Sequence, residues 1–498
     1  MLVGAEQGRL YGMPKFITRE VVGRAYDVGR EAVLELFDLM LAQQLALAAR
    51  VEELERRAAT DSHNSSKPPS SDPPGSHPSP SPRTKSLRKP SGKKSGGQPG
   101  HPGSTLKMVK HPDRLEVHFP DACQACGESL KEAPVVDVEK RQVFDLPKVL
   151  FEVTEHQVES RRCTCGKTTC GSFPEGVAAP VQYGPRLRAV AVYLSQYQLV
   201  PMERISDALA DVFGCEGFSE GTLDSALDEC HQSLAAVEEK IKEGLQRAAV
   251  AHFDETGLEV RGKLNWLHVA CTATLTHYGW AAQRGPAGAD TLGILPQFKG
   301  IGLHDGLETY WRYLWEHGLC NIHHLRELVK VEEHDKQPWA SAMQALLREM
   351  KASVDAAKAL DQTELAAAVV QDFEARYERL LAEGFALNPP PERSPKTRGR
   401  PKRGRVLALL DRLSIHREAA LRFLKDFRVP FDNNQAERDI RMVKVKQKVS
   451  GCFRSDNGAD RFCRIRGYIS TMRKQGKHIL ACLESVFLGN PIMPVTTT

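Results

Sequence analysis

The sequence AVAHFDETGLEV, residues 249–260, marks the point where helical periodicity gives way to short apolar segments. Its first residues, Ala249–Phe253, predict a buried strand, and Gly257 indicates that Asp254 lies at the exposed end of that strand. We expect three further strands at Leu258–Val260, Trp266–Leu275 and Gly302–His304, and helices near Asp290–Phe298 and from Leu307. This β-β-β-α-β-α order predicts an α/β core in which the first and fourth strands are neighbours.

Two other acidic residues occur in settings that complement Asp254. Asp305, in GIGLHDGLETY at residues 300–310, also closes a short apolar run and precedes Gly306, which predicts a second aspartate at a strand end. Glu437, in PFDNNQAERDIRMVKVKQ at residues 430–447, follows potential N-caps at 432–434 and lies in an expected amphipathic helix. Side-by-side strands would bring the two aspartates together, and the helix would add the glutamate.

Three converging carboxylates supply the hard oxygen ligands that Mg²⁺ or Mn²⁺ prefers. Two such ions about 4 Å apart activate a water and stabilise the leaving oxygen of a phosphodiester. The set Asp254, Asp305 and Glu437 therefore predicts phosphoryl transfer on nucleic acid. The alternative is that each aspartate belongs to an ordinary turn, since Asp-x-x-Gly is a common turn sequence.

The sequences around all three acids resemble those of the transposases of the insertion-sequence-66 family. The similar segments are HFDETG (252–257), LHDG (303–306), CNIHHLREL (320–328), DNNQAERDIR (432–441) and SGCFRS (450–455), together with NSSKPPSSD (64–72) and GHPGSTL (100–106). The resemblance extends from residue 25 to residue 490. It implies a DDE transposase with an RNase H-like core, in which Asp254, Asp305 and Glu437 match the catalytic acids. The Cys-x-x-His-x-x-Arg segment from Cys320 to Arg326 matches as well, without an assigned role.

Composition shifts divide the chain into several expected parts. The fold class we expect is an α/β RNase H-like catalytic core with a helical insertion, preceded by a coiled-coil or helical N-terminus and a small zinc-binding β module. The expected boundaries are 25–60 (helical or coiled-coil), 61–112 (disordered basic linker), 113–180 (zinc-binding module), 181–247 (helical), 248–330 with 406–450 (catalytic core), 331–405 (helical insertion with a basic tail) and 451–498 (C-terminal helical segment).

The first helical part carries a heptad pattern. Val33, Met40, Leu47 and Leu54 recur every seven residues, and the positions between them are filled by Phe37, Gln44 and Val51. This pattern predicts a dimerising coiled coil with Gln44 as a polar core position, and hence a homo-oligomer. The alternative is a single amphipathic helix of a bundle, which shows the same spacing over three heptads.

Four of the twelve cysteines form two close pairs. Cys123 and Cys126 have the two-residue gap of a zinc knuckle, and Cys163 with Cys165 forms a tighter second pair, for which Cys170 is a possible substitute. We expect a structural Zn²⁺ that folds a small β module including Val149–Val158. The remaining cysteines predict reduced, buried thiols.

Basic residues cluster although the net charge is only +5. Residues 61–112 hold nine Lys or Arg against two acids, and residues 438–477 hold twelve against three. Such clusters predict contact with a polyanion, or else plain tethers and solvated surfaces. The DNA-binding candidates are Lys93 and Lys94 in the linker, Arg398, Arg400, Lys402 and Arg403 in a stretch that resembles an AT-hook, and Arg438, Arg441, Lys444 and Lys448 on the helix after Glu437.

Residues 185–246 predict helices, including one capped by Ser219, in an outline that suits either helix-turn-helix DNA recognition or scaffolding. No secretory leader or uncharged membrane span is evident, so we expect a cytoplasmic, nucleoid-associated bacterial protein without a membrane partner. We expect double-stranded DNA, as element ends and target, and companion proteins of the same element as partners. The predicted activity is metal-dependent cleavage and strand transfer; the alternatives are an inactive DNA-binding regulator and a nuclease that does not join strands.

Overall fold

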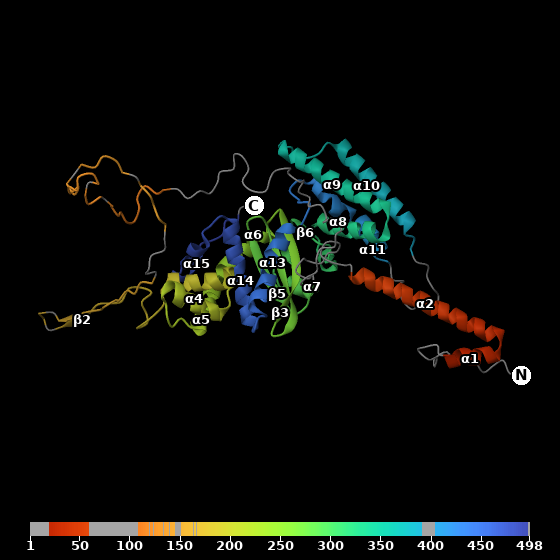
Figure 1. Cartoon of the computed structure of the whole chain (residues 1–498), viewed down its shortest axis with the longest axis horizontal. Coiled ribbons are helices and arrows are strands. Elements are labelled where there is room, and N and C mark those ends of the chain that lie inside the picture. The colour runs from red at the N-terminus through yellow and green to blue at the C-terminus, as the bar shows by residue number, and fades with distance from the viewer. Residues whose placement is uncertain are drawn as a thin grey trace.

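The computed structural model describes residues 19–58, 108–144, 151–390 and 404–496, apart from the single positions 119, 123, 133, 139, 163 and 166. Two helices at its N-terminal end, α1 (Arg19–Val28) and α2 (Arg30–Ala58), meet at Gly29 and lie away from the body of the protein (Figure 1). The helix predicted over 25–60 is therefore present. Its heptad residues are largely exposed to solvent, with Leu47 at 65% and Phe37 at 61%.

Helix α2 also contains the segment that comes nearest to a membrane span. By length and composition alone, the 23 residues Arg30–Glu52 are long and apolar enough to cross a membrane, with a mean hydropathy of 1.5. Four acidic residues, Glu31, Glu35, Asp38 and Glu52, lie within this segment. The same apolar surface suits pairing with another helix.

The centre of the protein is a five-stranded mixed sheet in the order β5-β4-β3-β6-β7. Strands β3, β4 and β5 pair antiparallel, whereas β3, β6 and β7 pair parallel. The strands are β3 (Val250–Val260), β4 (Lys263–Cys271), β5 (Thr276–Ala281), β6 (Ile301–His304) and β7 (Glu316–Leu319). A mixed α/β sheet core with the first and fourth strands as neighbours is therefore confirmed.

Several predicted elements differ in extent. The two short strands expected before and after Asp254 form one continuous strand, β3, because Gly257 pairs with Trp266 within the ladder and does not end it. The helix expected near Asp290–Phe298 is replaced by α7 (Pro286–Asp290) and the 3₁₀ turn η3 (Leu295–Gln297). The helix expected from Leu307 is only the 3₁₀ turn η4 (Glu308–Arg312), and strand β7 follows it. This strand was missed because four residues give too little pattern to recognise.

Two helices cover one face of the sheet. Helix α13 (Asn434–Ser450) packs against β3 and β4, and α14 (Asp456–Lys474) packs against β5. The buried set of this face comes from both layers: Leu258 and Val260 of β3, Val269 of β4, Ala436, Ile440 and Val443 of α13, and Phe462 of α14. Because side chains alternate along a strand, the even-numbered residues of β3 face α13 and the odd-numbered ones face the opposite core.

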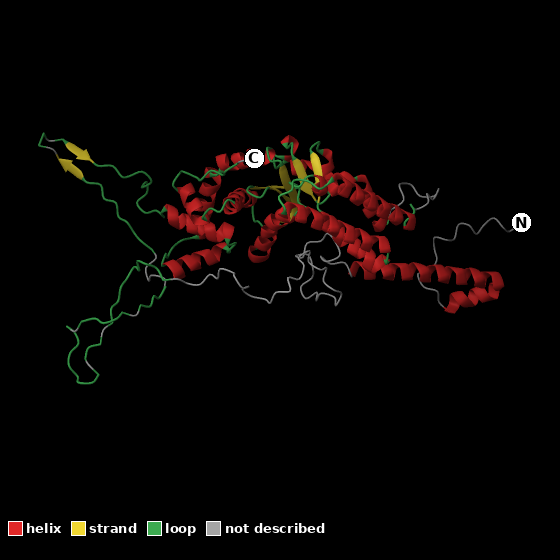
Figure 2. Ribbon diagram, turned by 90° about the horizontal axis from the view of Figure 1, so that it is seen from above, coloured by secondary structure: helices red, strands yellow, loops and turns green. Residues whose placement is uncertain are grey.

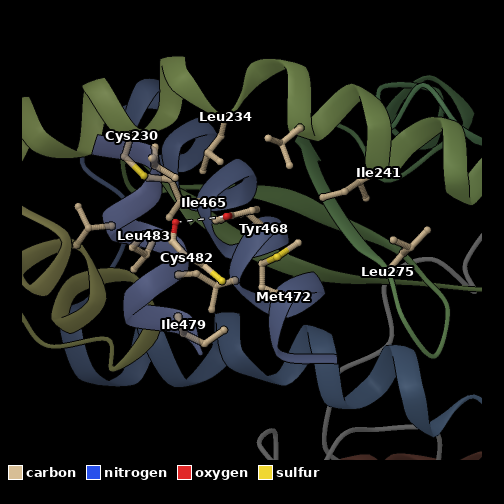
Figure 3. Packing of buried hydrophobic residues seen from close by; sticks show 14 of the residues in the cluster. Cys230, Leu234, Ile241, Leu275, Ile465, Tyr468, Met472, Ile479, Cys482 and Leu483 are labelled. Carbon is tan, nitrogen blue, oxygen red and sulfur yellow. Dashed lines mark hydrogen bonds between the residues drawn. The ribbon is translucent and has the colours of Figure 1, made fainter. Parts of the chain in front are cut away.

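The opposite core contains the helices that precede the sheet together with the C-terminal helices, and α14 contributes to both cores, with Phe462 in the first and Ile465 in this one. The preceding elements are α3 (Pro185–Val192), the π-helical turn η2 (Tyr193–Tyr197), α4 (Met202–Phe213), α5 (Glu220–Ser233) and α6 (Ala235–Gln246). Ser219 caps α5 as predicted, accepting a hydrogen bond from the Thr222 amide at 3.1 Å. Figure 3 shows Cys230 of α5 and Ile241 of α6 packing with Ile465, Tyr468 and Met472 of α14 and with residues of α15 (Ile479–Phe487).

The helical insertion expected over 331–405 is larger in the structure, because helices placed in the expected catalytic core on both sides of it also lie between β7 and α13. It comprises α8 (Asn321–Lys330), the π-helical turn η5 (Val331–Asp335), α9 (Pro338–Ala359), α10 (Ala367–Leu387), α11 (Arg405–Ile415) and α12 (Arg417–Lys425). Its core includes Trp339, Tyr377 and Leu410, and it meets the sheet at Ile301 and Leu303 of β6. The insertion therefore packs directly on the strand that leads to Asp305.

The segment expected to bind zinc forms two long projections from the body, one of which ends in a short hairpin (Figure 2). The hairpin pairs β1 (Ser160–Arg162) with β2 (Thr168–Cys170), and Cys165 lies in its turn. An isolated bridge between Ala122 and Ser129 closes the stretch that contains Cys126. The stretch Val149–Val158 was expected to belong to a β module, but its described part, residues 151–158, carries no strand.

Candidate active site at the junction of three elements

The register of two parallel strands brings Asp254 and Asp305 to one edge of the site. His252 of β3 and Leu303 of β6 form the last pair of that ladder, and each aspartate lies two positions beyond it. Asp254 lies inside β3 and not at the end of the strand as predicted, because β3 continues in its ladder with β4. Asp305 follows the end of β6.

Asp254 is held in an environment that disfavours its charge. Burial raises the pKa of Asp254 well above its usual value, and the nearby carboxylates of Glu255, Asp305 and Glu437 add to that rise, while His323 opposes it. Asp305 and Glu437 therefore both lie near enough to Asp254 to disfavour its charge. A bound cation is the group that would relieve this repulsion.

Asp305 is fixed by the turn that ends β6. Its Oδ1 accepts a hydrogen bond from the Leu307 amide at 3.0 Å, and Gly306 between them has a φ of 93°, a conformation that favours glycine. The buried His304 supports the same turn, because its Nδ1 lies 3.0 Å from the Gly306 amide and therefore accepts its proton. With Nδ1 accepting, His304 Nε2 donates to His317 Nδ1 at 3.0 Å.

Glu437 lies in the first turn of α13, and Asn433 holds that turn against the sheet. The sequence offered Asn433 as an N-cap, but in the structure its side chain makes no capping hydrogen bond to α13. Its Nδ2 donates to the Phe253 carbonyl at 2.8 Å, and its Oδ1 lies 2.8 Å from His252 Nδ1. Asp432 is the residue that bonds locally, since its Oδ1 accepts from the Asn434 amide at 3.1 Å. The helix that carries Glu437 is thus anchored to the strand that carries Asp254.

A second group of ligand atoms involves Glu437. Among the described residues, the three side chains whose ligand atoms all lie within 4.8 Å of one another are Cys320, His323 and Glu437, and the three predicted acids do not meet that limit together. His323 Nε2 lies 3.5 Å from Glu437 Oε1. Burial raises the pKa of the Cys320 thiol to about 12, and the Asn433 amide donates to its sulfur at 3.2 Å. Two members of this group, Cys320 and His323, belong to the Cys-x-x-His-x-x-Arg segment that had no assigned role.

Sequence reasoning missed a fourth acid, Glu255, beside the site. Its side chain is only 1% exposed and pairs with Arg284 at 2.8 Å, and the Tyr310 hydroxyl donates to it at 2.8 Å. Burial raises the pKa of Glu255, as does Asp305, while Arg284 and Tyr310 lower it. Both carboxylate oxygens are engaged, so Glu255 fixes Arg284 and Tyr310 beside Asp305. The adjacent acidic pair in HFDETG was the available signal.

The four cations predicted on α13 do not form one equivalent set. Arg438, Arg441 and Lys448 are exposed. Lys444 is half-buried and donates to the Gly257 carbonyl of β3, and burial lowers its pKa. The exposed three are available to an external anion, whereas Lys444 joins the helix to the sheet.

The other predicted sites lie partly or wholly outside the described residues. Cys126 and Cys165 are described and exposed. The remaining predicted positions fall outside: Cys123, Cys163, Lys93, Lys94, Arg398, Arg400, Lys402 and Arg403. The zinc ligand set, the basic linker and the AT-hook stretch therefore stay predictions.

Comparison with known families identifies the chain. Residues 180–461, more than half of its length, match the family described as Transposase IS66 family. Residues 120–166 match the zinc-finger binding domain of transposase IS66, a span that includes both predicted cysteine pairs and stops before Cys170. Residues 24–107 match a family of unknown function, and no curated protein matches.

These matches agree with the sequence resemblance in both family and order of parts. The zinc-finger match supports a structural Zn²⁺, and a transposase with such a domain implies DNA binding. The matched region of residues 180–461 contains the whole five-stranded sheet, all of α13 and the first residues of α14. The chain belongs to the IS66 family of transposases.

Proposed function

We propose that this transposase cleaves the ends of its element and joins them to target DNA at a metal site formed by Asp254, Asp305 and Glu437. The observation that carries the proposal is the placement of the three acids: Asp254 and Asp305 each lie two positions beyond the last β3–β6 pair, and Asn433 holds the helix that carries Glu437 on β3, while burial and neighbouring carboxylates raise the pKa of Asp254. Carboxylates gathered at such a cost are typical of sites that bind divalent cations. The β5-β4-β3-β6-β7 order, with three antiparallel strands followed by two parallel ones, supports an RNase H-like core.

The three acids fit Mg²⁺ or Mn²⁺ by their donor chemistry, since all ligand atoms are carboxylate oxygens. Two metal ions bound by these acids would activate a water or a 3′-hydroxyl and stabilise the leaving oxygen. The protein's own residues position the acids: Asn433 holds α13 on β3, and the His304–Gly306 turn fixes Asp305. The exposed Arg438, Arg441 and Lys448 provide positive charge beside the site for the DNA backbone.

The zinc module is proposed to use Cys123, Cys126, Cys163 and Cys165 as its ligands. The two described members, Cys126 and Cys165, each lie in a turn closed by β pairing, which is the setting of a zinc knuckle. In this proposal the Zn²⁺ folds the module, and double-stranded DNA at the element ends is the partner. Cytoplasmic, nucleoid-associated action follows from that partner.

Self-association is proposed to occur through α2. In a parallel pair, Phe37, Gln44 and Val51 would alternate with the heptad from Val33 to Leu54 along the seam. Arg50 and Glu55 would flank that seam at positions that face each other between chains, with opposite charges. A second copy of α2 is therefore the occupant that the exposed apolar face fits.

The test uses purified full-length protein, Mg²⁺ and a labelled duplex carrying the DNA ends that flank its own gene. We expect the wild type to give nicked and joined products on a denaturing gel and Asp254→Ala to give neither. Asp211→Ala, at an exposed aspartate of α4, is the matched control and should act as the wild type does. Nicking without joining would favour a simple nuclease, and equal binding without cleavage would favour the regulator.

A further inference from the structure

The Cys320–His323–Glu437 group joins two elements of the site. Cys320 is the residue that precedes α8 and His323 lies in its first turn, while Glu437 reaches them from the first turn of α13. Their three ligand atoms lie within 4.8 Å of one another. The potential donors are a sulfur, a nitrogen and an oxygen, and His323 Nε2 lies 3.5 Å from Glu437 Oε1.

Two polar atoms of this group lack a hydrogen-bond partner. Glu437 Oε1 and His323 Nδ1 are both buried, and neither has a partner among the described residues. The side chains of His323 and Glu437 are only 12% and 21% exposed, so solvent access is limited. Buried polar groups normally form hydrogen bonds. Two buried polar atoms without a hydrogen-bond partner beside a thiol therefore indicate that a ligand binds here.

The donor types of the group suit a thiophilic cation. Cys320 Sγ accepts a hydrogen bond from the Asn433 amide at 3.2 Å, and a bound cation would hold the sulfur as a thiolate against the burial that raises its pKa. Thiolate and imidazole prefer Zn²⁺ and similar thiophilic ions, whereas the carboxylate triad prefers Mg²⁺. Three protein ligands leave a fourth tetrahedral position free for water.

We propose that Cys320, His323 and Glu437 form a second metal site, selective for a thiophilic divalent cation of the Zn²⁺ class, distinct from the zinc module. Because the site shares Glu437 with the two aspartates, its occupation withdraws that carboxylate from the catalytic group. Zn²⁺ bound here therefore inhibits Mg²⁺-dependent cleavage, a consequence that rests on the proposed function. The binding of Zn²⁺ at this site does not depend on the proposed function.

Co²⁺ is the probe for binding, because it occupies zinc sites and gives a visible absorption band when a thiolate is a ligand. Metal-free full-length wild type, Cys320→Ser and Cys215→Ser are titrated with Co²⁺, without DNA or Mg²⁺. Cys215 is buried between α4 and α5, away from this group, and is the matched control. The zinc module is intact in all three proteins, so its ions cancel in the comparison.

We expect Cys320→Ser to bind one Co²⁺ fewer than the wild type and Cys215→Ser to bind the same number. Glu437→Gln is a second variant that leaves every cysteine in place and should also bind one fewer. Circular dichroism and the thermal midpoint establish that each variant is folded. Equal stoichiometry in all four folded proteins would overturn the proposed site.

Inhibition is measured separately, as the fold reduction in Mg²⁺-dependent nicking on adding Zn²⁺ to each protein. We expect a reduction of about tenfold or more in Cys215→Ser, which corresponds to about 1.4 kcal/mol. In Cys320→Ser we expect at most about twofold, because the proposed site has lost its thiol ligand. Equal inhibition in both would overturn the competition for Glu437. A protein that does not nick in Mg²⁺ at all contradicts the proposed function, and the Co²⁺ stoichiometry still decides the site.

Discussion

Asn433 Nδ2 donates a 2.8 Å hydrogen bond to the carbonyl oxygen of Phe253, the residue directly before Asp254. The same side chain contacts His252, and the Asn433 amide contacts Cys320, so one buried asparagine joins β3, α13 and the start of α8. The three acids come from segments far apart in the chain. Asn433 is the residue that ties two of those segments together beside the site.

Replacing Asn433 with alanine should therefore lower cleavage more than it lowers stability. Each buried group left without a partner costs about 1–3 kcal/mol, and a shift of about 1 Å at Glu437 costs about 100-fold in rate. Nicking rate and thermal midpoint are measured together. Asn434→Ala, at the neighbouring half-buried position, is the control and should retain the wild-type rate. A wild-type rate in Asn433→Ala would show that the anchor does not position Glu437.

Asp254→Asn should raise the thermal midpoint in metal-free buffer at pH 7. Because the pKa of Asp254 is raised by burial and by neighbouring carboxylates, the folded protein holds its proton more tightly than the unfolded chain does. Stability is then lost as the pH rises from the unfolded pKa, about 3.9, through the higher folded value. The asparagine avoids that loss, and the difference from the wild type should shrink as the pH falls towards 4.

Mg²⁺ provides the companion measurement on the same two proteins. It should raise the thermal midpoint of the wild type, and raise that of Asp254→Asn much less, because binding to the folded state alone stabilises it. Asp211→Asn serves as the exposed control in both comparisons. A variant that is less stable than the wild type without metal, or equally stabilised by Mg²⁺, would contradict the metal role of Asp254.

The cations of α13 should separate into two classes in DNA binding. Arg441 is exposed, so Arg441→Ala should weaken affinity for all sequences and reduce the slope of log affinity against log salt by about 1. Lys444 donates to the Gly257 carbonyl, so Lys444→Ala should leave that slope unchanged and lower the thermal midpoint. The measurement is a salt titration of binding to a labelled duplex. Equal changes in slope would mean that Lys444 also reaches phosphate.

Helix α2 offers a matched pair of leucines for testing self-association. Leu47 lies on the heptad seam and is 65% exposed, whereas Leu45 lies off the seam and is 64% exposed. Leu47→Glu should shift the protein to a smaller species in sedimentation velocity, and Leu45→Glu should not. If α2 enters a bilayer instead, both substitutions should reduce association with lipid vesicles, and neither should change the sedimenting species.

Strands β3 and β6 and helix α13 were accessible from sequence because they rest on local signals. Apolar runs before Asp254 and Asp305 mark β3 and β6, and the basic amphipathic pattern after Glu437 marks α13. Strand β7 and the continuity of β3 through Gly257 were not accessible, since ladder pairing decides both. Local pattern carries no information on which strand a glycine pairs with.

The contacts that organise the site depend on tertiary packing. Asn433 was predicted as a helix cap because asparagine commonly bonds its own backbone, but β3 offers it a buried carbonyl and a histidine. Lys444 was grouped with three exposed cations by helical spacing, yet it faces β3. The Cys320–His323–Glu437 group joins the beginning of the insertion to α13, which follows the insertion, so only the fold brings these residues together.

The most direct test of the central claim is a change of metal preference at Asp305. The variant Asp305→Cys replaces a hard carboxylate with a soft thiolate, which binds Mg²⁺ poorly and accepts Mn²⁺ better. Nicking of the labelled element ends is measured for this variant and the wild type in each metal. The account predicts that Asp305→Cys loses nicking in Mg²⁺ by about 100-fold or more and recovers part of it in Mn²⁺. Wild-type nicking by Asp305→Cys in Mg²⁺ would contradict the claim that Asp305 holds the catalytic metal.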